Sequence, residues 1–220
     1  MSRASPTRAV IFDLDGTLVD SMPLVLRAFA HALLPYCGEL TPEAITSHLG
    51  GPPDRMFRKL IADERNVPEA MQRLMDYDLA NWRLIQPFEG MHALLDHLER
   101  EQQSLALWTG RERESTELIL KEHGITPKLD VWVCGDDLPT HKPHPGGLEE
   151  ALRQLAVARD EALFVGDADV DVLAGSAGGV RTLLIAHDRV IDPAIRAKAW
   201  RTVATPAEAY AIVQVEVSRA

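Results

Sequence analysis

The sequence predicts an α/β protein, with a Rossmann-like three-layer core around a parallel sheet and a small all-helical domain inserted near its amino end. Short apolar runs that end at turn residues, such as residues 9–12, are typical of buried parallel strands. From Gly90 onward such runs alternate with helical segments, which is the pattern of parallel strands joined by crossover helices. Residues 21–87 show helical patterns alone, which favours an inserted domain.

The first helix of the insertion is expected from the helical spacing of apolar residues between Leu24 and Leu33. Proline lacks an amide hydrogen and clashes with the preceding turn, so Pro35 is expected to end this helix. Thr41 and Pro42 are the residue types of a helix cap and a first helical position, which predicts a second, short helix.

Two further helices are expected in the insertion, over residues 53–62 and 68–84. The longer helix should present an apolar face made of Met71, Leu74, Met75 and Leu79. A turn over residues 86–90 would then return the chain to the core. The predicted domains are a core of residues 8–20 and 88–220 and a helical domain of residues 21–87.

The core beyond residue 90 is expected to alternate regularly between helices and strands. The strands are predicted over residues 104–108, 131–134, 162–165 and 182–185, and the helices over residues 91–101, 112–123, 147–156, 170–177 and 206–213. Most of these strands are short apolar runs, as strands buried on both faces require.

The composition restricts the classes of partner. A chain of 220 residues, 46% of them hydrophobic, can bury a substantial core. The formal net charge of −10 argues against nucleic acid, because phosphates require a basic surface. No apolar run is long enough to span a membrane, and Cys37 and Cys134 are too few for a disulfide framework. We therefore expect a soluble, cytoplasmic protein.

The strand over residues 9–12 runs directly into Asp13 and Asp15, which are followed by Gly16. In open parallel sheets the functional groups lie just past the carboxyl ends of the strands. Gly16 allows a sharp turn, and two carboxylates brought together repel each other unless a cation or a shared proton compensates. Mg²⁺ prefers such hard oxygen ligands. This stretch therefore favours a functional acidic site over an ordinary Asp-Gly turn.

Later segments of the chain carry further candidate groups. Thr109 and Gly110 follow a second predicted strand, where a hydroxyl and an accessible amide can contact a phosphoryl oxygen. Lys142 lies in a turn segment with a proline on its carboxyl side. Asp167 follows another predicted strand, and Asp171 lies four residues later, within reach if a helix starts between them.

These positions resemble the four motifs of the haloacid dehalogenase-like (HAD) hydrolase superfamily, in the right order and over nearly the whole chain. Residues 13–21 are most similar to the first motif of the phosphatases in which a helical cap follows that motif. Within this branch the sequence resembles the phosphoglycolate phosphatase-like proteins. Thr109 matches the second motif, Lys142 with its proline the third, and Asp167 with Asp171 the fourth.

The resemblance implies a Mg²⁺-dependent phosphomonoester hydrolase that works through an aspartyl-phosphate intermediate. Asp13 would be the nucleophile, and Asp15 would be the general acid and base. Asp13, the main-chain carbonyl of Asp15 and Asp167 would hold Mg²⁺, with Asp171 supporting them through water or a second layer of contacts. The helical domain would be the cap, and its closure would exclude water.

The resemblance also implies which groups contact the substrate. The phosphoryl oxygens would be held by the side chains of Thr109 and Lys142 and by the backbone N–H groups of Leu14, Asp15 and Gly110. Many family members have asparagine where this chain has Gly110, so Arg111 is either the substrate contact or a solvated residue at a helix start. Arg55, in the turn that corresponds to the family's specificity loop, has the same two interpretations.

Three alternative functions are considered. A dehalogenase needs only one acid of the pair, so Asp15 counts against that branch. A sugar-phosphate mutase uses the same paired acids on the same scaffold, although Thr17 is more typical of the phosphatases. A non-catalytic binding protein is less favoured, because all the matched chemical positions are filled. The resemblance implies a small phosphorylated metabolite as the substrate, with no nucleic-acid or membrane partner.

Overall fold

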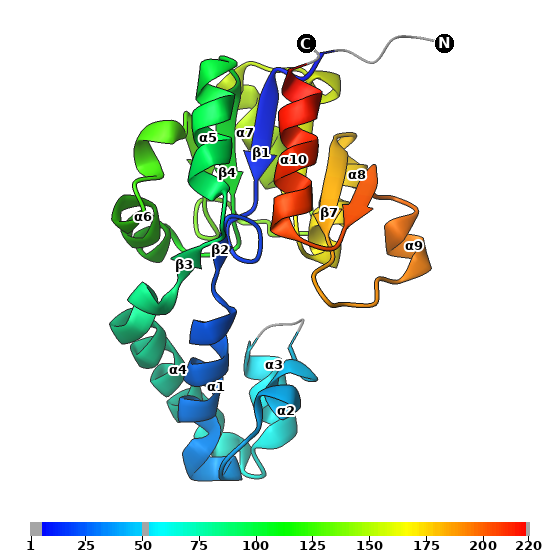
Figure 1. The fold of residues 1–220 in the computed structure, drawn as a ribbon. Coiled ribbons are helices and arrows are strands. Elements are labelled where there is room, and N and C mark those ends of the chain that lie inside the picture. The colour runs from blue at the N-terminus through cyan, green and yellow to red at the C-terminus, as the bar shows by residue number, and fades with distance from the viewer. Residues whose placement is uncertain (1–5, 50–52, 219–220) are drawn as a thin grey trace. The chain divides into compact units, whose positions relative to one another are not determined.

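The structure is a computed structural model, and it describes residues 6–49 and 53–218. The chain divides into two compact units (Figure 1). The first unit consists of Met1–Asp20 and Pro87–Ala220, and the second of Ser21–Gln86. We describe each unit separately.

The first unit is built on a six-stranded parallel sheet with the strand order β5-β4-β1-β6-β7-β8. Its strands are β1 (Ala9–Phe12), β4 (Ser104–Trp108), β5 (Val131–Val133), β6 (Ala162–Gly166), β7 (Arg181–Ile185) and β8 (Arg201–Val203). Phe12, near the end of β1, is in register with Leu107 of β4 and with Val165 of β6. The carboxyl ends of the three central strands are therefore level, so the loops that follow them start side by side.

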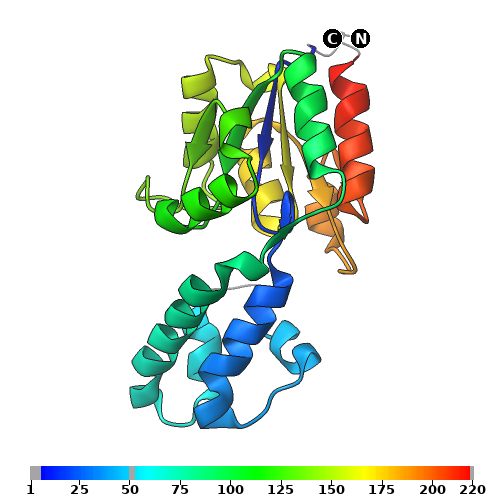
Figure 2. The ribbon, with the colours of Figure 1, turned by 60° about the vertical axis from the view of Figure 1, so that its left-hand side comes forward.

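Helices cover both faces of this sheet. In Figures 1 and 2, α5 and α10 lie side by side on one face, and α7 and α8 lie on the other. The helices are α5 (Met91–Arg100), α6 (Arg113–Glu122), α7 (Gly146–Leu155), α8 (Asp169–Gly178), α9 (Pro193–Arg196) and α10 (Pro206–Val217), with short 3₁₀ helices at Thr126–Lys128 and Arg159–Glu161. The predicted three-layer, Rossmann-like α/β fold is confirmed.

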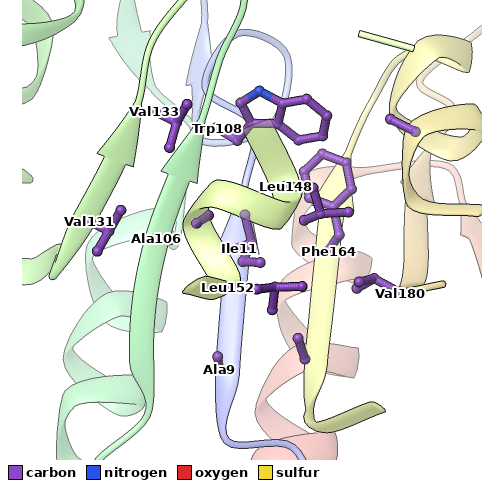
Figure 3. Close-up of a cluster of buried hydrophobic side chains, with 13 residues drawn as sticks. Ala9, Ile11, Ala106, Trp108, Val131, Val133, Leu148, Leu152, Phe164 and Val180 are labelled. Carbon is purple, nitrogen blue, oxygen red and sulfur yellow. The ribbon is translucent and has the colours of Figure 1, made fainter. Parts of the chain in front are cut away.

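A cluster of buried apolar side chains fills the space between the sheet and α7 (Figure 3). Ile11, Trp108 and Phe164 come from β1, β4 and β6, while Leu148 and Leu152 come from α7. The ring centroids of Trp108 and Phe164 are 5.4 Å apart. Because Trp108 is the last residue of β4, this packing fixes where the loop after β4 begins.

The second unit is helical. It contains α1 (Met22–Cys37), α2 (Pro42–Thr46), α3 (Pro53–Leu60) and α4 (Val67–Asn81), with 3₁₀ helices at Glu64–Asn66 and Trp82–Leu84. The side chain of Thr41 accepts a hydrogen bond from the backbone N–H of Ala44 at 3.2 Å, so Thr41 caps α2 as its sequence predicts. The two segments that link the units are the short strands β2 (Val19–Asp20) and β3 (Gln86–Pro87), which pair with each other.

The prediction that Pro35 ends the first helix is wrong, because α1 continues to Cys37. Proline removes the donor that would normally bond to the carbonyl four residues earlier, which is that of His31. In this structure the guanidinium of Arg73, on α4, donates to the His31 carbonyl at 3.1 Å. A side chain of the neighbouring helix thus satisfies the carbonyl that Pro35 leaves open, and the helix does not end there.

The predicted apolar face of α4 is also wrong in part. The buried residues of α4 are Val67, Ala70 and Leu74, which share one stripe at spacings of three and four residues. Met75 and Leu79 lie next to that stripe and are 54% and 58% exposed.

The short strand β8 and the short helix α9 were not expected from the sequence. β8 has only three residues, of which Arg201 is exposed and the other two are partly buried, so it lacks the apolar run that marks the central strands. An edge strand can pair through its backbone without such a run. Among the described residues, no helix is both long and apolar enough to cross a membrane.

Candidate active site

The loops at the carboxyl edge of the sheet bring four of the predicted site residues together. The Nζ atom of Lys142 is 2.7 Å from Oδ1 of Asp13 and 2.7 Å from Oδ1 of Asp171. Asp13, Asp167 and Asp171 each offer a carboxylate oxygen, and these oxygens lie within 4.8 Å of one another. Three carboxylates and one ammonium therefore form a single buried cluster at the ends of β1 and β6.

Lys142 is held by apolar as well as charged neighbours. Its ammonium lies 4.9 Å from the ring centroid of Trp108 and 5.4 Å from that of Phe164, both members of the cluster in Figure 3. Its side chain is only 9% exposed. A lysine packed against two rings and bridging two carboxylates has little freedom to leave the site.

Two glycines make room for the carboxylates. A Cβ atom on Gly16 would lie 2.3 Å from a carboxylate oxygen of Asp167, and Gly16 also has a φ of +73°. A Cβ atom on Gly166 would lie 2.4 Å from a carboxylate oxygen of Asp171. Only glycine leaves this space for the acids, so both glycines are part of how the cluster is built.

Burial and mutual repulsion shape the protonation of the cluster. Burial raises the pKa of the Asp13 carboxyl above its ordinary range, although the charge of Lys142 opposes this shift. Burial, together with the charges of Asp13 and Asp171, also raises the pKa of Asp167. Burial alone would lower the pKa of Lys142, but the charges of Asp13 and Asp171 outweigh it and raise that pKa. The lysine is therefore charged, whereas burial favours the protonated, neutral forms of Asp13 and Asp167 in the absence of a further cation.

The donor set of this cluster fits a hard divalent cation. All three acids supply oxygen, which is the ligand type that Mg²⁺ prefers. A divalent ion would compensate the negative charge that burial makes costly. The residues present are therefore able to hold a metal ion of this kind.

The loop after β1 is held by its own backbone. The carbonyl of Leu14 accepts hydrogen bonds from the N–H groups of Thr17, Leu18 and Val19 at 3.3, 2.9 and 3.1 Å. From α10, the hydroxyl of Tyr210 donates to the carbonyl of Thr17 at 2.7 Å. This turn fixes the backbone of Asp15, which lies within it, and that of Asp13, which directly precedes it.

The loop after β4 places Thr109, Gly110 and Arg111 at the same edge. Thr109 is buried, and its hydroxyl accepts from the N–H of Arg111 at 3.1 Å. The guanidinium of Arg111 donates to both carboxylate oxygens of Asp15, from Nε at 3.1 Å and from Nη2 at 2.9 Å. A Cβ atom on Gly110 would meet no heavy atom within 4 Å. Arg111 is thus a partner of Asp15, which the sequence did not indicate.

The turn after β7 contributes two residues that the sequence analysis missed. Nε2 of His187 is 2.7 Å from the carbonyl oxygen of Gly16, and the guanidinium of Arg189 donates to the main-chain carbonyl of Asp167. Arg189 is also 3.5 Å from a carboxylate oxygen of Asp169. His187 and Arg189 follow a strand that was predicted over residues 182–185, so the rule about carboxyl ends of strands could have found them.

The second candidate for substrate specificity lies in the other unit. Arg55 is an exposed residue of α3. Residues 50–52 of the turn before it are outside the described residues. Its role stays a prediction.

The chain combines a parallel α/β core, an acidic cluster at the carboxyl edge of its sheet and a helical insertion after the first strand. This combination is typical of a class of hydrolases, and comparison with known proteins identifies that class. A family model described as haloacid dehalogenase-like hydrolase matches residues 10–185. A relative named pyrophosphatase PpaX, from Halalkalibacterium halodurans, is 31% identical over 180 residues, which cover 81% of this chain and 83% of the relative. The protein belongs to the haloacid dehalogenase-like hydrolase family.

Solved structures show the same fold. A suggested phosphoglycolate phosphatase from Lactobacillus plantarum is similar with a TM-score of 0.78 and 23% identity, over 94% of this chain and 100% of that one. A suggested beta-phosphoglucomutase from Thermotoga maritima is similar with a TM-score of 0.80 and 22% identity, over 95% of this chain and 99% of that one. At these identities the likeness concerns the fold.

Proposed function

We propose that this protein is a Mg²⁺-dependent phosphomonoester hydrolase that acts on a small phosphorylated metabolite. The observation that carries the proposal is the bridge that Lys142 makes between Asp13 and Asp171, at 2.7 Å from each. It gives the proposed nucleophile a buried cationic neighbour, and phosphoryl transfer depends mostly on positioning and charge stabilisation. Membership of the hydrolase family supports the same reaction class.

The reaction would proceed in two steps. A carboxylate oxygen of Asp13 attacks phosphorus and forms an aspartyl-phosphate, while Asp15 gives a proton to the leaving oxygen. Asp15 then takes a proton from the water that hydrolyses the intermediate, which releases phosphate and restores Asp13. The hydrogen bonds from Arg111 to both oxygens of Asp15 hold that carboxylate in one orientation and favour its ionised form, so Arg111 has to release one oxygen before Asp15 can give a proton.

The remaining groups would hold the phosphoryl oxygens and the cation. Lys142 and Thr109 would contact the phosphoryl oxygens together with the N–H groups of Leu14, Asp15 and Gly110. Mg²⁺ would be held by Asp13, by the main-chain carbonyl of Asp15 and by Asp167, with Asp171 supporting the site through Lys142. The chemistry that the cation supplies when bound is neutralisation of charge on the phosphoryl group.

Pyrophosphate is a second candidate substrate, because the relative at 31% identity is named a pyrophosphatase. Its leaving group is phosphate, which needs less protonation than the alkoxide of a monoester. The mutase alternative has weaker support, because the solved structure named as a mutase shares only 22% sequence identity with this chain, so the similarity concerns the fold. Release of free phosphate distinguishes the hydrolases from a mutase, which would yield an isomerised sugar phosphate.

Residues 21–87 would act as the cap that closes over the site and selects the leaving group. We also propose a cytoplasmic location, which fits the two free cysteines, Cys37 and Cys134. Cell fractionation with an antibody against the native chain tests the location.

The test of the function is phosphate release from a panel of phosphomonoesters and pyrophosphate, with Mg²⁺ and with a chelator. We expect release that requires Mg²⁺ and that is lost in the variant Asp13→Asn. The matched control is Asp160→Asn, at an exposed aspartate in the 3₁₀ helix before β6. Equal phosphate release by wild type and Asp13→Asn would disprove the nucleophile assignment, and release unaffected by chelator would disprove the metal requirement.

A further inference from the structure

The tight turn after β7 contacts both of the loops that carry site acids. Its backbone closes through a hydrogen bond from the N–H of Arg189 to the carbonyl of Ala186 at 3.1 Å. His187 takes the left-handed conformation, with a φ of +50°, which is uncommon for a residue with a side chain. From this turn, His187 reaches the carbonyl of Gly16, and Arg189 reaches the carbonyl of Asp167.

The carbonyl of Gly16 is a sensitive point of the site. Gly16 follows Asp15 directly, and its α-carbon abuts the Asp167 carboxylate so closely that a Cβ atom would lie 2.3 Å from it. A rotation of the Gly16 peptide would therefore displace Asp15 along the chain and Asp167 across the contact. A group that fixes the Gly16 carbonyl therefore also fixes the distance between Asp15 and Asp167.

His187 is well placed to hold it. A carbonyl oxygen only accepts hydrogen bonds, so Nε2 of His187 carries the proton in this contact at 2.7 Å. The ring is oriented by Phe88, whose ring centroid is 5.7 Å away at an interplanar angle of 31°. Phe88 is itself tied to the loop after β1, because its N–H donates to the carbonyl of Leu18 at 3.0 Å.

We propose that His187 is a positioning residue of the active site, which fixes the Gly16 peptide and thereby the arrangement of Asp15 and Asp167 that receives the cation. Arg189 fixes the main chain of Asp167 from the same turn. Neither residue touches substrate in this role. The inference rests on the proposed function, since it assigns these residues to the cation site of that function.

The test separates the hydrogen bond from the ring. His187→Phe keeps a ring against Phe88 but removes the donor, whereas His187→Gln keeps an N–H donor without the ring. Val190→Ala is the matched control, because Val190 lies next to the turn and is fully exposed. Binding of Mg²⁺ alone is measured without substrate, by the rise of the melting temperature with Mg²⁺ concentration and by calorimetry.

We expect His187→Phe to bind Mg²⁺ about 10-fold more weakly than wild type, which is the usual effect of losing a group that orients a ligand. Its kcat should fall by a similar factor at fixed Mg²⁺ while KM for the substrate stays near that of wild type. His187→Gln should recover most of the Mg²⁺ affinity, and Val190→Ala should match wild type. Arg189→Met provides a second variant if His187→Phe does not fold, and it too should weaken Mg²⁺ binding.

Equal Mg²⁺ affinity in wild type and His187→Phe would overturn the inference, and so would equal losses in His187→Phe and His187→Gln. If His187→Phe is unfolded, unchanged Mg²⁺ affinity in Arg189→Met would overturn it. The proposed function fails in a different way, because wild type would then release no phosphate from any substrate of the panel, whatever its affinity for Mg²⁺.

Discussion

Gly16 and Asp167 are in such close contact that a methyl group on the glycine would lie 2.3 Å from the carboxylate. The glycine therefore defines the position of an acid that is 151 positions away in the chain. This contact leads to the first prediction.

Gly16→Ala should destabilise the protein and weaken the site together. The new methyl group forces Asp167 to move, and the φ of +73° adds backbone strain of about 1 kcal/mol. We expect Mg²⁺ affinity and kcat to fall about 10- to 100-fold. Gly38→Ala is the control, since Gly38 has a φ of +71° and a Cβ atom there would meet nothing within 4 Å. Because it lacks the steric clash, it should lose only the free energy of unfolding that the backbone strain accounts for, measured with urea, and keep full activity.

Lys142→Met should remove activity far more than it removes the fold. The variant loses the cation between Asp13 and Asp171, and we expect kcat to fall by about 10²- to 10³-fold or more. Lys128→Met is the control. Lys128 also contacts two acids, Asp96 and Glu99 at 2.8 and 2.5 Å, but those acids are exposed, so the free energy of unfolding should change by about 1 kcal/mol or less. Comparable kcat values for Lys142→Met and wild type would show that the lysine is dispensable.

The metal-free protein should become less stable as pH rises. Burial raises the pKa of Asp13 and of Asp167, so the folded state holds protons that the unfolded chain has released above about pH 4. The free energy of unfolding should therefore fall from about pH 4 upward until both groups ionise. Mg²⁺ competes with those protons and should restore more stability at alkaline than at acidic pH. Urea melts at several pH values, with Mg²⁺ or chelator, measure this; a rise of metal-free stability over that range would contradict it.

Gly110→Asn should be tolerated. A Cβ atom at this position meets nothing within 4 Å, so we expect the free energy of unfolding to change by about 0.5 kcal/mol or less. The added amide should alter the KM values of different substrates by different factors, which a substrate panel measures. Gly135→Asn is the opposite case, because its Cβ atom would lie 2.2 Å from the Gly110 carbonyl oxygen, and it should lower the melting temperature markedly.

Arg73 and Pro35 should be coupled in stability. Arg73→Met removes the donor to the His31 carbonyl and should cost about 1 to 3 kcal/mol. In the Pro35→Ala background the backbone can supply its own N–H, so the same substitution should cost less. A double-mutant cycle from denaturant melts gives the coupling, and additive effects would refute it.

The fold was largely predictable because its signals are local. The strands at Ala9–Phe12 and Ser104–Trp108 lie where apolar runs predicted them, and the carboxyl-end rule brought attention to Asp13 after the first strand and to Thr109 after the second. Family membership confirms the resemblance seen in the motifs.

Pairings between distant loops could not be predicted in the same way. The bond between Arg111 and Asp15 joins residues 96 positions apart, and that between His187 and Gly16 joins residues 171 positions apart. No periodicity encodes such contacts, because they depend on strand order and on side-chain direction. The prediction for Pro35 was wrong for a related reason. The rule that proline ends a helix is local, and here the side chain of Arg73, from another helix, satisfies the carbonyl that proline leaves without a donor.

The Leu14 carbonyl, which gathers three backbone amides, has a consequence for how this protein can evolve. Apart from the requirement for Gly16, the turn is closed by main-chain atoms that every residue other than proline possesses, so its shape does not depend on the identity of the neighbouring acids. Mutation can therefore exchange the reactive side chains one at a time while the scaffold that displays them persists. A substitution that changes the reaction at this site therefore does not require a change in the backbone of the loop.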